Sequence, residues 1–177
     1  AWNSDPGGIS DAGAVYLYRI DDNGTISRLH KVRANNGAAD DQFGNSVSLS
    51  GNLLAVGERL SDTDGVFNAG EAYLYRLENN GSVTLTTKVS APVKAVNDYF
   101  GNSVSLSGNI LAVGAHEANP NGVASAGVAY LYRVETNGSA SYLTQLSATD
   151  KDSYDIFGWS ISLSGNLLAV AAPLSDP

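Results

Sequence analysis

Polar and apolar residues alternate in the segment 46–50, which reads Ser-Val-Ser-Leu-Ser. Alternation with a period of two predicts a β-strand with one face more buried than the other. The segment 52–57 is a continuous apolar run after its first residue, which is typical of a strand covered on both faces. Only the Ser-Gly-Asn sequence at 50–52 separates the two segments, so we expect a tight turn in which glycine takes a positive φ.

Two more strands follow in the same stretch of chain. In the segment 72–76, two tyrosines would lie on one face of a strand and Leu74 on the other. The Asn-Gly pair that comes next predicts a type I′ hairpin turn into a fourth strand within 82–91. The four segments together predict an antiparallel meander, and none of them has the 3.6-residue periodicity of a helix.

The whole pattern recurs with a period of 57 residues. Phe43, Phe100 and Phe157 each begin a copy that runs from Phe-Gly through the alternating strand to the apolar strand. The tyrosine-bearing strands and the Asn-Gly turns keep the same spacing without an insertion. Self-similarity at a fixed period is the signature of a repeat architecture.

Tandem four-stranded meanders predict an all-β fold of β-propeller blades, in which small sheets pack face to face around an axis. The period divides the chain into a half blade at 1–39, full blades at 40–96 and 97–153, and a complementary half blade at 154–177. A stacked solenoid is the competing geometry, but its repeats are usually shorter and rarely hold four strands.

The amino-acid composition of the chain limits the classes of molecule that it could bind. Eighteen acidic residues against ten basic ones give a net charge of −8, and the basic residues are scattered, which argues against nucleic acid. No apolar run approaches the roughly 18 residues that cross a bilayer, so we expect no membrane insertion. The absence of cysteine excludes disulfides and thiolate metal sites. An acidic chain without Cys or Met but rich in Gly, Ser and Asn favours a secreted or surface protein of bacterial type.

The phrase Phe-Gly, alternating strand and Leu-Ala-Val-Gly-Ala resembles the FG-GAP repeat of integrin α-subunit propellers and of bacterial surface proteins. The resemblance implies an extracellular propeller that recognises protein or glycan. In integrin-type blades an Asp-rich calcium loop joins the first two strands, whereas this sequence has Ser-Gly-Asn at 50–52, 107–109 and 164–166. The chain therefore resembles the bacterial subclass with a short hairpin, and calcium binding at the family's usual place is not carried over.

A different loop offers oxygen ligands for Ca²⁺ close to glycines. The candidate metal ligands are Asp5, Asp11, Asp62, Asp64 and Asn68. The third copy of this loop has Asn119 and Asn121 in their place and no carboxylate. Because Asx and Gly residues are also what ordinary turns use, plain turn chemistry is favoured over a calcium site.

The remaining polar and aromatic residues indicate no catalytic site. Asp41, Asp98 and Asp155 stand two residues before each Phe-Gly, and this repetition predicts a structural role as acceptors of backbone N–H groups. His30 and His116 occupy non-equivalent positions and have no nucleophile at a recognisable spacing, so no catalytic residue is predicted, and Ca²⁺ at the loop above is the one candidate cofactor.

The two tryptophans allow two interpretations. Trp2 and Trp159 could stack on sugars, as in lectins, or fill the interfaces between blades. The second interpretation is favoured.

The two ends of the sequence fall in the same inter-strand loop of the repeat, so the half blades are complementary. Half blades of separate copies could complete each other, with a dimer giving a six-bladed ring, or further repeats of a longer chain could do so. The second interpretation is favoured. In either case unpaired strand edges predict that the chain is not a free monomer.

The leading functional hypothesis is a non-enzymatic extracellular scaffold for adhesion, recognition or assembly, with a protein or glycan ligand. The alternatives are a glycan-binding lectin propeller and an accessory propeller of a larger secreted enzyme. All three rest in part on the fold, which does not fix function by itself.

Overall fold

The computed structural model describes residues 12–34 and 39–176. Within them the chain is all-β, and its helical segments are the short 3₁₀ turns η2 (Thr63–Gly65) and η3 (Pro120–Gly122). Neither has the length or the apolar character that a bilayer-spanning helix needs. The strands are β1 (Val15–Ile20), β2 (Ile26–Val32), β3 (Ser46–Ser50), β4 (Leu53–Glu58), β5 (Glu71–Leu77), β6 (Val83–Val89), β7 (Ser103–Ser107), β8 (Ile110–Ala115), β9 (Val128–Val134), β10 (Ala140–Leu146), β11 (Ser160–Ser164) and β12 (Leu167–Ala171).

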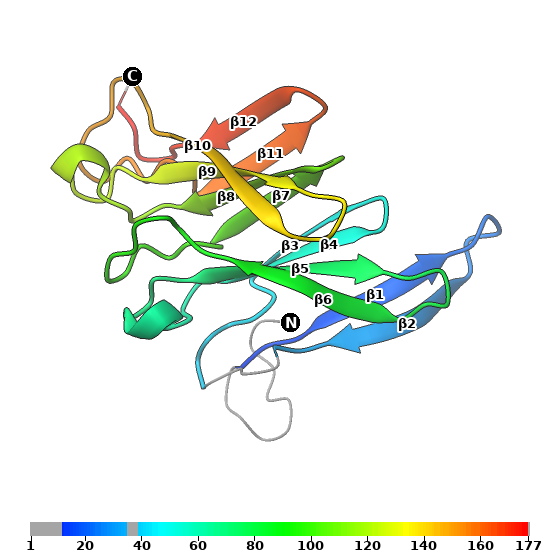
Figure 1. The fold of residues 1–177 in the computed structure, drawn as a ribbon. Coiled ribbons are helices and arrows are strands. Elements are labelled where there is room, and N and C mark those ends of the chain that lie inside the picture. Colours follow the sequence, from blue (N-terminus) through cyan, green and yellow to red (C-terminus); the bar gives the residue numbers. More distant parts are fainter. Residues whose placement is uncertain (1–11, 35–38, 177) are drawn as a thin grey trace.

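The strands form four antiparallel sheets in which each strand pairs with its neighbour in the sequence. β3 to β6 and β7 to β10 make two four-stranded meanders, and β1–β2 and β11–β12 make the two-stranded sheets at either end. Figure 1 shows the sheets stacked face to face in chain order, without closing into a ring. The predicted fold class of two full propeller blades between two half blades is confirmed.

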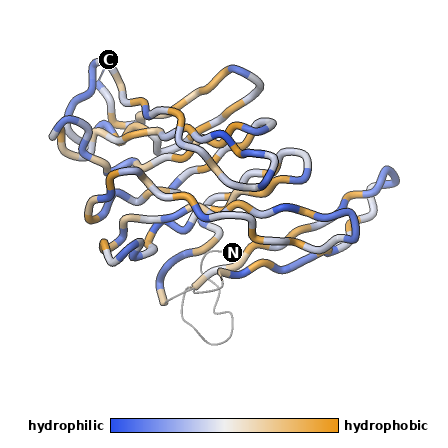
Figure 2. Tube along the Cα trace, in the orientation of Figure 1, coloured by the Kyte–Doolittle hydropathy of each residue, from blue (hydrophilic) through white to orange (hydrophobic). Residues whose placement is uncertain are grey.

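The turn between β3 and β4 has the predicted form. Ser50 pairs with Leu53, which leaves a two-residue connection, and Gly51 takes a φ of 58°. A residue with a Cβ would be strained in this left-handed conformation. Figure 2 shows that hydrophilic residues also gather at the tip of the hairpin between β1 and β2, where the chain turns in solvent.

The turn between β5 and β6 is a hairpin, but the predicted type I′ geometry is wrong. Type I′ needs a positive φ at both central residues, and here only Gly81, with φ 84°, has one. The Gly81 N–H donates to the Glu78 carbonyl at 2.9 Å, as in a type I turn followed by a left-handed glycine. The reason is Asn80, whose Oδ1 accepts the Ser82 N–H at 2.9 Å and so holds the turn without a left-handed asparagine.

The two faces of β5 pack against different sheets. Tyr73 and Tyr75 lie in one apolar cluster with Phe43 and with Leu17 of the preceding half blade. Leu74 lies in another cluster, with residues of the following blade such as Phe100. The predicted division of the tyrosines and Leu74 between opposite faces is therefore confirmed, and both faces are buried.

The serines of the alternating strands hold neighbouring blades together. Ser48 Oγ on β3 accepts the Leu106 N–H of β7 at 2.9 Å, and Ser105 Oγ on β7 accepts the Leu163 N–H of β11 at 2.9 Å. Ser50 Oγ accepts the Gly108 N–H in the same way. The serines of the alternating pattern therefore face the inner strand of the next blade. There they accept hydrogen bonds from backbone N–H groups that have no partner within their own sheet.

The Phe-Gly motif forms a second junction between blades. The Phe100 N–H donates to the Ala69 carbonyl at 2.9 Å, and Gly70 and Phe100 form a parallel β-bridge. Gly70 has a φ of 81°, and a Cβ at this position would overlap the Phe100 carbonyl oxygen. Equivalent bridges join Gly13 to Phe43 and Gly127 to Phe157. The repeated Ala-Gly and Phe-Gly dipeptides are thus the two sides of one contact.

Candidate ligand-binding site

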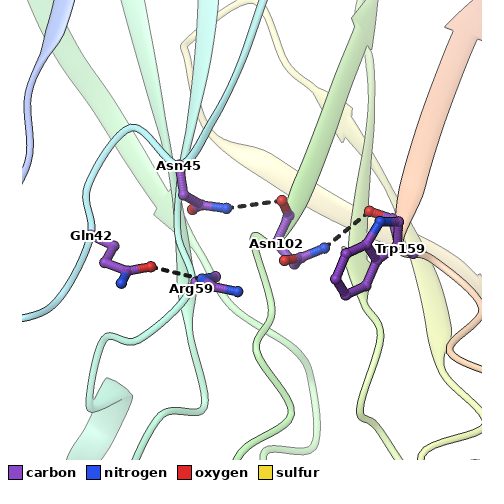
Figure 3. Close-up of a pocket in the computed structure, with 5 residues that line it drawn as sticks. All are labelled: Gln42, Asn45, Arg59, Asn102 and Trp159. Carbon is purple, nitrogen blue, oxygen red and sulfur yellow. Dashed lines mark hydrogen bonds between the residues drawn. The ribbon is translucent and has the colours of Figure 1, made fainter. Parts of the chain in front are cut away.

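A hollow of about 300 Å³ lies where the turns that precede the inner strands of three successive sheets meet. Its lining residues are polar apart from one tryptophan: Gln42, Asn45, Arg59, Asn102 and Trp159. The residues just before β3, β7 and β11 contribute four of them, and Arg59 follows β4. Figure 3 shows Gln42 and Arg59 on one side of the hollow, the indole on the other, Asn102 between Arg59 and the indole, and Asn45 above Arg59.

Amide side chains connect the three turns across the blade junctions. Asn45 Nδ2 donates to the Asn102 carbonyl at 2.9 Å, and Asn102 Nδ2 donates to the Trp159 carbonyl at 3.0 Å (Figure 3). Asn45 Oδ1 is buried and has no hydrogen-bond partner in the structure. A buried acceptor without a partner costs free energy, so this oxygen reduces the stability of the junction.

Arg59 supplies the positive charge of the hollow. Its Nε donates to Gln42 Oε1 at 2.8 Å, which fixes the guanidinium plane. In the described part of the chain, no ion pair is recorded for Arg59, although the whole chain carries a net charge of −8. The terminal nitrogens of a guanidinium held in this way can donate two parallel hydrogen bonds to a carboxylate.

Aromatic rings form the other wall. The Trp159 side chain is 48% exposed and contacts His116 edge to face, with ring centroids 4.9 Å apart. Tyr99 in turn stacks on His116, with ring centroids 5.5 Å apart. Burial, followed by the charge of Arg59, lowers the pKa of His116, while Glu117 raises it. The net lowering keeps the imidazole neutral at pH 7, so it supports the indole as an aromatic ring rather than as a cation.

Two of the candidate metal ligands already bind protein groups, one through a hydrogen bond within the loop and one through an ion pair. Asp62 Oδ1 accepts the Asn68 N–H at 2.9 Å, and Asp64 Oδ2 lies 3.1 Å from Lys94 Nζ. Asn119 makes the bond equivalent to that of Asp62 in the next copy. Among residues 12–34 and 39–176, no group of three or more His, Cys, Asp or Glu side chains is placed to hold a metal ion. Asp5 and Asp11 lie outside the described residues, and calcium binding at this loop stays a prediction.

The aspartates before the Phe-Gly motifs have the predicted structural role. Asp98 Oδ2 accepts the Ala95 N–H and Asp155 Oδ2 accepts the Asp152 N–H, both at 2.7 Å. Burial raises the pKa of Asp98, and its backbone hydrogen bond opposes that shift. The segment that would correspond to Ala95 for Asp41 lies outside the described residues.

Glu58, at the end of β4, is a buried carboxyl group that sequence reasoning missed. Its side chain is fully buried and Oε2 accepts a 2.7 Å hydrogen bond from the Tyr73 hydroxyl. Burial raises the pKa of Glu58 to about 7, and the hydrogen bond from Tyr73 opposes the shift. The equivalent positions hold Ala115 and Ala172, so the departure from the repeat was the available signal. Because a fully buried group is not accessible to a substrate, Glu58 affects the stability of the fold.

Four-stranded meanders joined through their inner strands and their Phe-Gly bridges define a set of β-propeller blades. The chain belongs to the FG-GAP repeat family, because the model of that repeat matches residues 27–75, 83–132 and 142–177. The three matches together cover well over half of the chain, so the family resemblance of the sequence is confirmed.

Among solved structures, the chain is similar to Sqt1 of Saccharomyces cerevisiae, with 11% sequence identity and a TM-score of 0.48. The match covers 81% of this chain and 32% of Sqt1, so the chain spans about a third of the length of that protein. A comparison with curated proteins finds no sequence match.

Proposed function

We propose that this chain is a non-enzymatic scaffold of a secreted or surface protein, in which the open blades assemble with further blades of the same kind. FG-GAP repeats occur in extracellular proteins, and this supports the proposed location. Adhesion and recognition would then be properties of the loops that the rigid blades display.

The observation that carries the proposal is an apolar surface on the inner strand β3. Val47 and Leu49 are 52% and 56% exposed, whereas their equivalents on β7, Val104 and Leu106, are 7% and 5% exposed. Val104 and Leu106 are covered because a complete blade precedes them, as their cluster with Ala55 and Leu74 demonstrates. Among the described residues, the strand pair β1–β2 is the one element pair that precedes β3, and we infer that an inner strand pair would cover Val47 and Leu49.

The open edges of the half blades carry the residue types from which a matching ladder could form. β4 pairs with β5 so that Leu53 is opposite Arg76 and Val56 is opposite Tyr73. By the 57-residue period, β12 and β1 carry the same residue types as that ladder. Two such edges can form a ladder between a β12 of one array and a β1 of another. The same ladder forms whether the added blade belongs to a second copy or to further repeats of a longer chain.

The proposal is tested by measuring the molar mass of the chain by size exclusion with multi-angle light scattering over a range of concentrations. We expect a species larger than the monomer, which shifts toward the monomer in Val47→Asp because a carboxylate cannot be buried against an inner strand pair. Val93→Asp is the matched control, since Val93 is 79% exposed and lies outside the inner strands. A wild-type chain that stays monomeric at every concentration contradicts the proposal.

A further inference from the structure

The three copies of the repeat carry different residue types at the positions that surround the hollow. Strand and junction residues recur from copy to copy, because each blade has the same structural requirements. The hollow is built by three repeat positions that do not recur in this way. Their residues are Gln42, Tyr99 and Ile156 at the first, Asn45, Asn102 and Trp159 at the second, and Arg59, His116 and Pro173 at the third.

This divergence indicates that the blade fold does not require these particular side chains. Asparagine at the second position bridges to the next blade twice, and the last copy, after which the described residues hold no further blade, has Trp159 there. An arginine, a histidine and a proline all fit the third position. A charged group and a large, half-exposed aromatic ring therefore meet in one hollow for a reason other than the architecture.

We propose that the hollow binds a saccharide that carries a carboxylate, such as a uronic acid unit. The Arg59 guanidinium, oriented by Gln42 and without an ion-pair partner among the described residues, receives the carboxylate. The exposed face of Trp159 packs on the apolar face of the sugar ring. Asn45 and Asn102 form the polar wall between these two groups.

The dimensions and the polarity of the hollow agree with this ligand class. About 300 Å³ is at the lower end of the range for ligand pockets, which suits a short saccharide segment. The lining combines one aromatic platform with planar amide and guanidinium groups, and so offers hydrogen bonds in the plane of the sugar hydroxyls. The site would be one of the recognition surfaces that the proposed scaffold displays, and none of its lining residues belongs to β1 or β12, the strands proposed to pair between arrays.

Trp159 itself reports on binding. The chain contains two tryptophans, so Trp2→Phe leaves Trp159 as the only indole. This variant is titrated with tri-galacturonate and with the neutral galactotriose while tryptophan fluorescence is followed. We expect a saturable change with the acidic sugar, an affinity about tenfold or more above that of the neutral one, and weakening by added salt, because the bond to Arg59 is charge-assisted.

The matched pair of arginine variants tests the assignment. In the same background, Arg59→Ala should reduce affinity for tri-galacturonate about tenfold or more, Arg59→Lys should retain part of it, and Arg133→Ala should leave it unchanged. Arg133 is exposed on β9 and does not line the hollow. Trp159→Ala, followed by calorimetry, should lose binding, and an unchanged melting temperature shows that the variant is folded.

Four results overturn the inference. They are the absence of any saturable signal, equal affinity for the neutral sugar, unchanged affinity in Arg59→Ala, and equally tight binding of a glutamate peptide of the same charge, which would assign the hollow to acidic peptides. Light scattering on the same samples separates this inference from the scaffold proposal, because assembly through the blade edges does not depend on ligand binding.

Discussion

At the scale of single residues, Glu58 is an ionisable group held in an environment very different from water. Its carboxyl is fully buried beside Tyr73, and its pKa is raised from 4.5 to about 7. The folded state therefore retains a proton that the unfolded chain has already lost between pH 4.5 and 7. The contribution of Glu58 to the free energy of unfolding is greatest at low pH and is lost as the pH rises through 7, by an amount on the order of 3 kcal/mol.

We expect Glu58→Gln to remove this dependence, because the amide does not titrate and can still accept the Tyr73 hydroxyl. The measurement is the denaturant midpoint of wild type and variant at pH 5 and at pH 8. The variant should gain stability relative to wild type at pH 8, and the difference between the two proteins isolates Glu58 from His116, which titrates in both. A difference that does not change with pH would show that Glu58 is not protonated in the folded protein.

Gly70 tests the contact between the Ala-Gly and Phe-Gly motifs. Gly70 and Gly81 have φ values of 81° and 84°, but only at Gly70 would a Cβ overlap a neighbouring backbone atom, and Gly81 has open space around it. Gly81→Ala should therefore cost about 1 kcal/mol, from the left-handed conformation alone. Gly70→Ala should cost that and a further 1–3 kcal/mol or so from overlap with Phe100. Equal losses in urea unfolding would mean that the junction relaxes around the methyl group.

The residue scale is also where sequence reasoning was weakest. Nothing local in the sequence shows that Glu58 is buried, because its environment is built by Tyr73 on the adjacent strand and by the preceding sheet. The hollow was missed for a similar reason. Asn45, Asn102 and Trp159 follow one another at intervals of 57 residues, and only the stacking of the blades brings them together.

At the scale of elements, the serine contacts between inner strands carry a direct prediction. Ser105→Ala removes the acceptor of the Leu163 N–H and leaves that donor without a partner between β7 and β11. We expect a loss of about 1–2 kcal/mol in the free energy of unfolding, measured by urea denaturation. Ser141→Ala is the control, because Ser141 is exposed on β10. If both variants unfold alike, the serines do not hold the blades together.

The strands themselves were predictable because their pairing is local. Hairpin turns place each strand next to its neighbour in sequence, so alternation and turn residues were sufficient to place β3 to β6. The type of one turn was not predictable from the Asn-Gly pair, since the side chain of Asn80 offered a second way to hold it. The role of the serines was also hidden, because a polar face that meets another backbone has the same sequence pattern as a polar face that meets water.

At the scale of the whole molecule, the period was the decisive observation. It predicted the number and the order of the sheets before any contact was known, and the FG-GAP match agrees with it. What the period could not provide is the surface on which the copies differ. Identical positions report on architecture, and the hollow around Arg59 and Trp159 is where the copies are not identical.

The junction between blades also has a consequence for how such chains change. Ser48 bonds to Leu106 as Ser105 bonds to Leu163, and Gly70 bridges to Phe100 as Gly127 bridges to Phe157. Recombination that inserts or removes one whole period would therefore join surfaces that already fit. Arrays of this type can lengthen or shorten in evolution by units of one blade, and each new copy is then free to acquire its own side chains at the exposed turns.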